Sequence, residues 1–228
     1  MTRYIKRHSL QARITHGIFA ISCILLAISG LFVFVPALAA MVPSGLTFVF
    51  RMSHRVLGII FIAVPIVSAI MAPSGVKHMW QIYTERWDKD DKLFILKFVP
   101  YMLACKKVHM PDQHEVKSGQ RIADGALIFG SLAIAISGVF LLLGTTLVEF
   151  DAGLMLVMRL VHDLAFLWLC VFGLAHIFLG AGLFQPYRGT IRLMFGDGNV
   201  SEADALYHWG HWAREELEKG DKIIVKED

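Results

Sequence analysis

Four long apolar stretches constrain this chain more than any other feature of its sequence. They cover residues 14–35, 56–72, 122–148 and 154–184, with approximate ends. A helix that crosses the hydrocarbon core of a bilayer needs about 20 mainly apolar residues. The stretches are too long and too apolar for barrel strands, and inside hydrocarbon every backbone polar group needs an internal partner. The sequence therefore predicts an all-α membrane protein built on a four-transmembrane-helix bundle.

The composition agrees with a membrane location. Hydrophobic residues make up 56% of the 228 residues and charged residues only 18%, whereas a soluble domain carries about 25% charged residues. This balance excludes a disordered chain and disfavours the alternative, a soluble domain with four buried core helices. A net charge of +3 is too small to indicate a nucleic-acid partner. We expect a single domain over residues 1–228, with no cleavable signal peptide and no internal repeat.

Lysine and arginine residues predict the orientation of the chain, because they accumulate in the cytoplasmic loops of membrane proteins. Of the 22, 19 lie in residues 1–13, in the middle segment 73–121 or in the tail 185–228. We therefore expect both termini and the middle segment to face the cytoplasm. The remaining three lie on the other side, and they are Arg51, Arg55 and Arg159.

The middle segment, residues 73–121, is too long for a bare loop. Trp80, Tyr83 and Trp87 recur at spacings of three and four residues, and a second apolar set spans residues 94–102. This pattern predicts one or two amphipathic helices. They would lie on the cytoplasmic membrane surface, in contact with lipid, or form a docking surface for another subunit, and the two roles are compatible.

Four of the ten histidines belong to the predicted spans, where ionisable side chains are costly and usually functional. In the predicted orientation, His54 and His162 lie near the outer ends of their helices, and His16 lies near the cytoplasmic end of its helix. His176 follows His162 by 14 residues, which is about 21 Å along a helix and on the same face. The four histidines thus sort into an outer pair and an inner pair.

These pairs have the chemistry of haem ligands. Two imidazoles from opposing helices at matching depth can hold six-coordinate haem iron, and the core between facing helices is a usual place for a cofactor. We predict an outer haem iron held by His54 and His162, and an inner haem iron held by His16 and His176.

Glycines and arginines near the histidines fit the same prediction. Gly58 and Gly180 each follow a histidine by four residues, and there they would clear space for a macrocycle. Arg13, Arg51 and Arg159 each precede a histidine by three residues. They are candidates for binding the haem propionates, with interfacial anchoring as the alternative.

Other uses of the histidines remain alternatives at this point. In a haem-free transporter they would carry protons or metal ions, although a zinc transporter would normally add carboxylates at the same depth. Four isolated histidines bonded to hydroxyl or carbonyl groups would fit a purely structural anchor. The spacing of His208 and His211 does not by itself indicate a metal site. No Cys-x-x-Cys-His motif for covalent haem and no cysteine cluster for an iron–sulfur centre occurs.

Motifs along nearly the whole chain carry a family resemblance. They are Arg13-Ile-Thr-His16, Arg51-Met-Ser-His54-Arg-Val-Leu-Gly58, His162 with His176, Ser118-Gly119-Gln120-Arg121, Gly196-Asp-Gly-Asn-Val-Ser201 and Trp212-Ala-Arg214-Glu215. With these motifs the chain resembles the cytochrome b, or gamma, subunit of membrane-bound respiratory formate dehydrogenase. That subunit belongs to a wider group of dihaem cytochromes b, which includes those of nickel–iron hydrogenases and thiosulfate reductase.

The resemblance implies cofactors, partners and a location. It implies two haem b groups in a multi-pass protein of the bacterial inner membrane, with an iron–sulfur subunit and a catalytic dehydrogenase subunit bound on the outer side. Such complexes can form higher oligomers. The chain would be an electron-transfer and quinone-reducing subunit rather than a stand-alone enzyme. A hydrogenase or a thiosulfate reductase is the alternative partner.

The resemblance also implies a quinone site. Electrons from the outer partner would cross both haems and reduce a quinone, menaquinone, on the cytoplasmic side. Gly119, Gln120 and His176 match the residues that line the quinone pocket in the family. Lys117 stands where the family often has asparagine, which is a departure from the pattern at this pocket.

Overall fold

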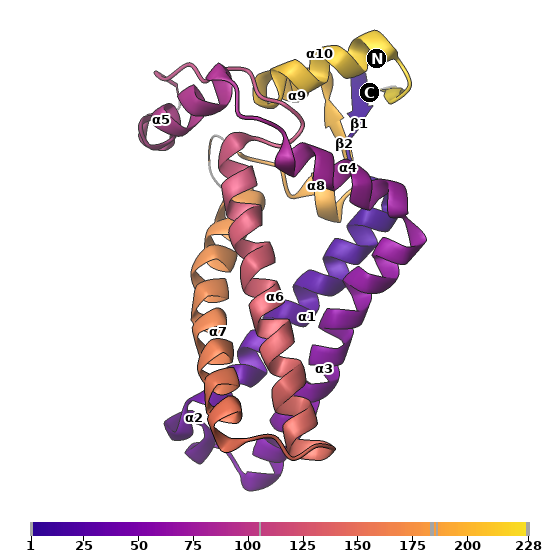
Figure 1. Ribbon diagram of the computed structural model, residues 1–228. Coiled ribbons are helices and arrows are strands. Elements are labelled where there is room, and N and C mark those ends of the chain that lie inside the picture. The colour runs from indigo at the N-terminus through magenta and orange to yellow at the C-terminus, as the bar shows by residue number, and fades with distance from the viewer. Residues whose placement is uncertain (1, 105, 183–184, 186, 227–228) are drawn as a thin grey trace. The chain divides into compact units, whose positions relative to one another are not determined.

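The computed structural model describes residues 2–104, 106–182, 185 and 187–226 of the chain. Within these residues four helices are long and apolar enough to cross a membrane (Figure 1). They are α1 (Leu10–Phe34), α3 (Ser44–Met71), α6 (Ser118–Thr146) and α7 (Ala152–Gly180). The predicted all-α membrane protein with four transmembrane helices is confirmed.

The helix bounds differ from the predicted ones mainly at the start of α3. This helix begins at Ser44, twelve residues before the predicted start at residue 56. Arg51, His54 and Arg55 interrupt the apolar run there, so hydropathy alone places the boundary after them, although the backbone continues as a helix. A short helix, α2 (Pro36–Ala40), precedes α3. At the other end of the chain α7 ends at Gly180, and the predicted end at residue 184 lies outside the described residues.

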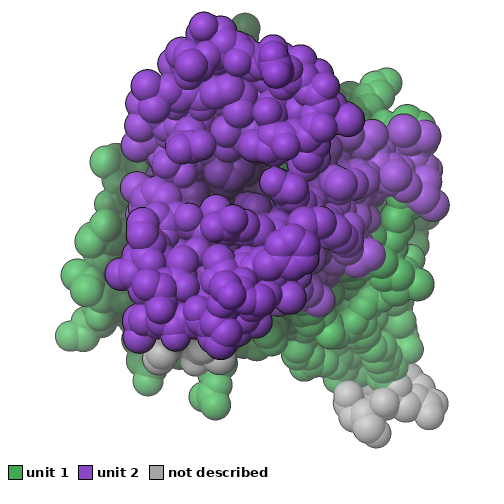
Figure 2. Space-filling model, turned by 90° about the horizontal axis from the view of Figure 1, so that it is seen from below, with its two compact units in different colours: residues 1–14, 72–125, 175–228 green, residues 15–71, 126–174 purple. Residues whose placement is uncertain are grey.

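The chain divides into two compact units, which Figure 2 distinguishes by colour. Unit 1 consists of residues 1–14, 72–125 and 175–228. Unit 2 consists of residues 15–71 and 126–174, which include most of the four long helices. The single domain predicted from the sequence stays a prediction.

A small sheet in unit 1 joins the two ends of the chain. The strand β1 (Thr2–Lys6) is the middle of three strands and pairs antiparallel with β2 (Asn199–Ser201) and β3 (Ile223–Lys226). Since the N-terminal and C-terminal strands are neighbours in one sheet, the two ends of the chain lie on the same side of a membrane. Which side this is stays a prediction. The sequence did not predict the sheet, because strands of three to five residues carry too little alternation.

Two helices cover this sheet, namely α9 (Glu202–His208) and α10 (Gly210–Lys219). Ser201 begins α9 as its N-cap, since its hydroxyl accepts a hydrogen bond from the backbone of Asp204. Gly220 ends α10 at φ 78°, a conformation that glycine adopts without strain. The core between them consists of Ile5, Val200, Ala205, Trp209, Trp212 and Ala213. Full burial of an aliphatic side chain such as Ile5 contributes about 1.5–3 kcal/mol.

The same core holds a buried arginine. The guanidinium carbon of Arg7 lies 4.0 Å from the ring centroid of Trp209 and 4.6 Å from that of Trp212. One arginine nitrogen also donates to the backbone carbonyl of Glu115. Burial lowers the pKa of Arg7 to about 10, although nearby Glu115 raises it. The two aromatic faces therefore offset part of the desolvation cost of a guanidinium that stays charged.

A buried lysine lies beside this arginine. The ammonium of Lys117 is 4.4 Å from the ring centroid of Tyr187 and 4.6 Å from that of Trp209, and it lies 3.1 Å from Nδ1 of His208. Burial, with a further effect of Arg7, lowers the pKa of Lys117 well below its ordinary value. Burial, Lys117 and Arg7 lower the pKa of His208 to about 3. The imidazole is therefore neutral at pH 7 and accepts a hydrogen bond from Lys117.

The middle segment forms two helices of the predicted kind, α4 (Pro73–Thr84) and α5 (Lys89–Leu103). In α5 one face is buried at Phe94 and Tyr101, whereas Leu96, Val99 and Leu103 are exposed. The predicted amphipathic helices are thus present, and their contact with lipid or another subunit stays a prediction. A short helix, α8 (Arg192–Phe195), lies between α7 and β2 along the chain.

We expect acid to destabilise this core through His208. The unfolded chain binds a proton near the ordinary histidine pKa of 6.5, whereas folded His208 binds one only near 3. Between these values the unfolded state holds more protons, so the free energy of unfolding falls as the pH falls, by at most about 1.4 kcal/mol per pH unit. Denaturant unfolding followed by tryptophan fluorescence at pH 7.0 and pH 4.5 measures the fall.

The variant His208→Gln should reduce this pH dependence, because glutamine does not titrate. The control is His109→Gln, which changes an exposed histidine in the same unit and should leave the pH dependence as it is. An equal pH dependence in wild type and His208→Gln would contradict the assignment.

Candidate functional site

Two of the predicted ligand histidines face each other in unit 2. The ring centroids of His54, from α3, and His162, from α7, are 6.3 Å apart, with the ring planes at 70°. Their residue numbers differ by more than one hundred, so only the packing of the helices brings them together. The predicted outer pair is therefore a pair of neighbouring imidazoles.

A serine hydroxyl holds each ring. Nδ1 of His54 is 3.0 Å from Oγ of Ser29, on α1, and that hydroxyl donates its proton to the carbonyl of Leu25 at 2.8 Å. A hydroxyl has one proton, so Ser29 can only accept from the histidine. The proton of the imidazole is then on Nδ1, and the lone pair of Nε2 is left for a metal.

The second histidine has the same arrangement. Nδ1 of His162 is 3.1 Å from Oγ of Ser137, on α6, and that hydroxyl donates to the carbonyl of Ala133 at 2.7 Å. Ser29 and Ser137 are both almost completely buried. Two neutral imidazoles, each with an unprotonated Nε2, can bind one metal ion between them.

A glycine follows each serine and gives the ring its space. A Cβ atom on Gly30 would lie 3.3 Å from Cε1 of His54, and one on Gly138 would lie 3.2 Å from Cε1 of His162. These contacts are tighter than ordinary packing, so the rings need glycine at both positions. By contrast, Gly58 and Gly180, which the sequence suggested, have open space around the place of a Cβ.

The sequence contains a signal for these residues that was missed, because the chain has an internal repeat. Ala-Ile-Ser-Gly occurs at residues 27–30 and again 108 residues later at 135–138. The same offset of 108 residues relates Arg-Ile-x-x-Gly at 13–17 to 121–125, and His54 to His162. The expectation of no repeat is wrong, and its physical reason is that the two copies match only at buried contact positions.

The repeat extends to the helices themselves. Like the motifs, the first residues of α1 and α6 differ by 108 in number, and so do those of α3 and α7. Each half of the chain is thus a pair of long helices in which a serine of the first helix holds a histidine of the second. This explains why the two ring environments are alike.

The two predicted inner ligands occupy unlike positions in this repeat. His16 corresponds to Asp124, and His176 corresponds to Ser68. His16 belongs to unit 2 and His176 to unit 1, so their pairing stays a prediction. Within unit 1, Nδ1 of His176 lies 3.8 Å from a carboxylate oxygen of Asp124.

Asp124 is the centre of a polar cluster in unit 1. Its second oxygen accepts a hydrogen bond from the hydroxyl of Tyr83 at 2.5 Å and one from the side-chain amide of Gln120 at 3.2 Å. Burial and the neighbouring carboxylate raise the pKa of Tyr83 far above its ordinary value, so the phenol stays protonated and donates. The structure thus brings Gln120 and His176 to one carboxylate.

The motif around Gly119 also has a structural role. A Cβ atom on Gly119 would lie 3.2 Å from the ring of Phe94 on α5, so glycine permits a close approach. The backbone of buried Ser118 donates to the side-chain oxygen of Gln113 at 3.0 Å, and this bond satisfies the start of α6. Arg121 pairs with Asp91 at 3.6 Å.

The three arginines suggested for propionates differ in their surroundings. Arg13 donates to the backbone carbonyl of Gly196, and a Cβ at Gly198 would lie 3.0 Å from its Nε. Arg51 is exposed and lines a shallow hollow together with Thr47. Arg159 is exposed. Their role towards propionates stays a prediction.

The sequence was also compared with known families and proteins. A sequence model of the family described as prokaryotic cytochrome b561 matches residues 7–197, which include the four span histidines and both copies of the repeat. Among curated proteins, none matches the chain. Since the match covers most of the 228 residues, the chain belongs to the prokaryotic cytochrome b561 family, and it is a multi-pass bacterial membrane cytochrome b that binds haem b and transfers electrons.

Proposed function

We propose that this chain is the dihaem cytochrome b subunit of a membrane-bound dehydrogenase of the formate dehydrogenase type. His54 and His162 hold an outer haem, and His16 and His176 hold an inner one. Electrons enter at the outer haem from an iron–sulfur subunit on the outer side of the membrane. They leave to a quinone on the cytoplasmic side.

The facing pair of His54 and His162 is the observation that carries this proposal. Metal–nitrogen bonds of about 2 Å on either side, together with the half-widths of two rings, add to about 6 Å between ring centroids. The observed separation is 6.3 Å. The serine contacts leave both Nε2 atoms for iron, and Gly30 and Gly138 allow the rings to stay where they are. When bound, haem supplies one-electron chemistry, and the protein sets ligand orientation and basicity.

The polar cluster around Asp124 supports the quinone site. Reduction of a quinone takes up protons, so its site needs donors and a path for protons. Tyr83, Gln120 and Asp124 offer a phenol, an amide and a carboxylate beside His176. Lys117 does not join this cluster, since its ammonium contacts His208, Tyr187 and Trp209. The departure at position 117 therefore leaves the donors of the cluster unchanged.

The formate branch rests on motifs outside the spans. Gly196-Asp-Gly-Asn-Val-Ser201 forms the turn and strand that pair with β1, and Trp212 lies in the core under α10. These residues support the tail fold that the resemblance implies, whereas the partner itself binds elsewhere. The cytochrome b subunits of hydrogenase and thiosulfate reductase are the alternatives within the same chemistry. The subunits that co-purify with the chain from its native membrane distinguish these three.

The first test is a count of haems. The full chain in mild detergent should give two haem b per chain in a pyridine haemochrome assay, with a dithionite-reduced minus oxidised spectrum of the b type. His54→Ala or His162→Ala should lower the count to one, because each removes a ligand of the outer haem only. A wild-type count of one would remove the inner pair from the proposal, and a count of zero in folded protein would remove both.

The seating glycines give a sharper prediction. Gly30→Val and Gly138→Val should each lower haem occupancy of the outer site several-fold, because the added atoms meet the ring of His54 or His162. Gly45→Val is the matched control, since the place of a Cβ at Gly45 is open. Haem content and helical circular dichroism are measured together. Equal haem content in all three variants would count against ligation by these two rings.

The serine contacts predict a change in redox potential. Ser29→Ala removes the acceptor for Nδ1–H of His54, and Ser137→Ala does the same for His162. The ligand becomes less basic and stabilises ferric iron less, so the reduction potential of one haem should rise. Ser22→Ala changes another buried serine of α1 and serves as the control. A redox titration in which Ser29→Ala and Ser22→Ala coincide would refute the orienting role.

A further inference from the structure

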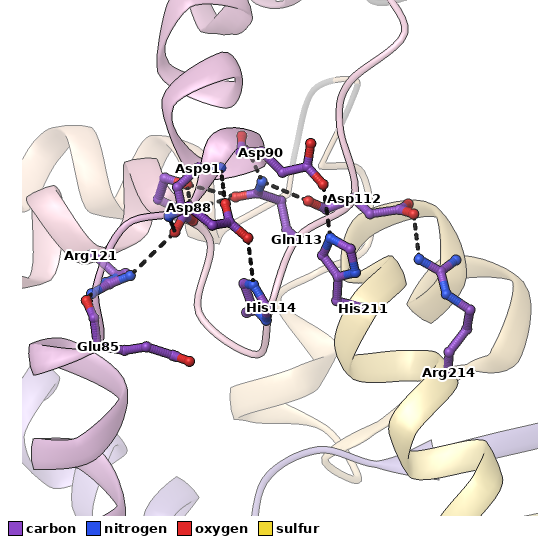
Figure 3. A network of polar contacts seen from close by, with 11 residues as sticks. Glu85, Asp88, Asp90, Asp91, Asp112, Gln113, His114, Arg121, His211 and Arg214 are labelled. Carbon is purple, nitrogen blue, oxygen red and sulfur yellow. Dashed lines mark hydrogen bonds and ion pairs between the residues drawn. The ribbon is translucent and has the colours of Figure 1, made fainter.

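A second set of histidines and carboxylates lies in unit 1, outside the membrane spans. Figure 3 shows how three parts of the chain meet there. Asp88 and Asp90 come from the start of α5, and His114 comes from the segment that leads to α6. His211 comes from the start of α10. The haem proposal uses none of these residues.

Three of these side chains have the composition and spacing of a metal site. Asp88, His114 and His211 each offer one ligand atom, and the three atoms lie within 4.8 Å of one another. Nε2 of His114 is 3.1 Å from a carboxylate oxygen of Asp88, and the two imidazole rings are stacked with centroids 4.8 Å apart. Ligand atoms around tetrahedral zinc are about 3.3–3.6 Å apart. The three groups therefore need to close by about an ångström, and their side chains are 32–43% exposed and free to move by that amount.

The backbone around the three ligands is held by other contacts. One oxygen of Asp88 accepts from the backbone of Asp91 at 2.7 Å and caps α5, which leaves the other oxygen for His114. The backbone carbonyl of Gln113 accepts from the backbone of His211 at 3.1 Å, and this bond ties α10 to the residue before His114. The ligands are therefore brought together by contacts that they do not themselves make.

Asp90 orients one of the ligands. Its carboxylate lies 2.9 Å from Nε2 of His211. Ligand histidines in metal sites commonly donate to such a carboxylate, which fixes the ring and raises its basicity. Asp90 is thus placed as an outer partner of the site rather than as a fourth ligand of the same set.

The charges of the network favour a cation. Within the described residues, Arg121 pairs with Asp91, and Arg214 pairs with Asp112. For Asp88 and Asp90 the recorded ion pairs are with histidines. With neutral imidazoles the site therefore carries two negative charges that a divalent cation would balance.

We propose that Asp88, His114 and His211 bind one divalent ion of the zinc type. Two imidazoles and a carboxylate are the ligands that zinc accepts, with water in the fourth position, whereas magnesium and calcium prefer oxygen ligands alone. The ion joins α10 to the start of α5 and so clamps the C-terminal tail onto the middle segment. The sequence pointed only to His208 with His211, but His208 contacts Lys117 and the partner of His211 is His114.

The test uses the full chain, purified without a histidine tag and stripped with a chelator. Isothermal titration with Zn²⁺ should give one ion per chain. His114→Ala and His211→Ala should abolish this binding. Asp90→Asn should weaken it about 10–100-fold, as removal of an outer partner does. His78→Ala is the matched control, because His78 is also a partly exposed histidine of unit 1 paired with a carboxylate, Glu115, at 3.0 Å. It should bind zinc as the wild type does.

A measurement on the wild type keeps the proposal testable if a variant does not fold. X-ray absorption at the zinc edge is separate from the iron edge of haem, and it should show two imidazole ligands among four nitrogen or oxygen neighbours. Absence of zinc binding by the wild type would overturn the proposal. So would a zinc shell without two imidazoles, or an equal loss of binding in His78→Ala and His114→Ala.

Discussion

The absence of water in hydrocarbon is the constraint on which this structure depends. Backbone groups meet it by forming helices, but an imidazole inside a span needs a partner from another helix. Here that partner is a serine hydroxyl, which is already bonded to a carbonyl of its own helix. One contact therefore satisfies the histidine, fixes its proton on Nδ1 and sets the distance between two helices. Packing and ligand chemistry are decided by the same atoms.

Much of the fold could be read from the sequence, and the reasons are physical. Long apolar runs are the strongest pattern that a chain can carry, so the four spans and the four histidines within them were predictable. The start of α3 was not, because Arg51 and Arg55 break the hydropathy of a continuous helix. The sheet was not, because its strands are short and its pairing joins the two ends of the chain. Gly30 and Gly138 were missed because they serve histidines on other helices, whereas the search followed each histidine along its own.

Unit 1 shows a different way of burying charge. Arg7 and Lys117 lie among Trp209, Trp212 and Tyr187, with ring faces rather than carboxylates as their main neighbours. The cost of this arrangement appears in the pKa values of Lys117 and His208, both of which are lowered. A core built on flat aromatic faces accepts a cation without a rigid ion pair. Lysine is therefore compatible with position 117, immediately before the start of α6.

The internal repeat gives the bundle two chemically different ends. At positions 54 and 162 both halves carry the same residue, so neither half is distinguished there. At positions 16 and 124, and at 68 and 176, one half carries a histidine and the other an aspartate or a serine. Two identical hairpins would treat both faces of a membrane by one rule and so could not tell which way a charge should travel. Divergence at only these few positions makes the bundle a one-way device, with a proton-handling end defined by what the second copy changed.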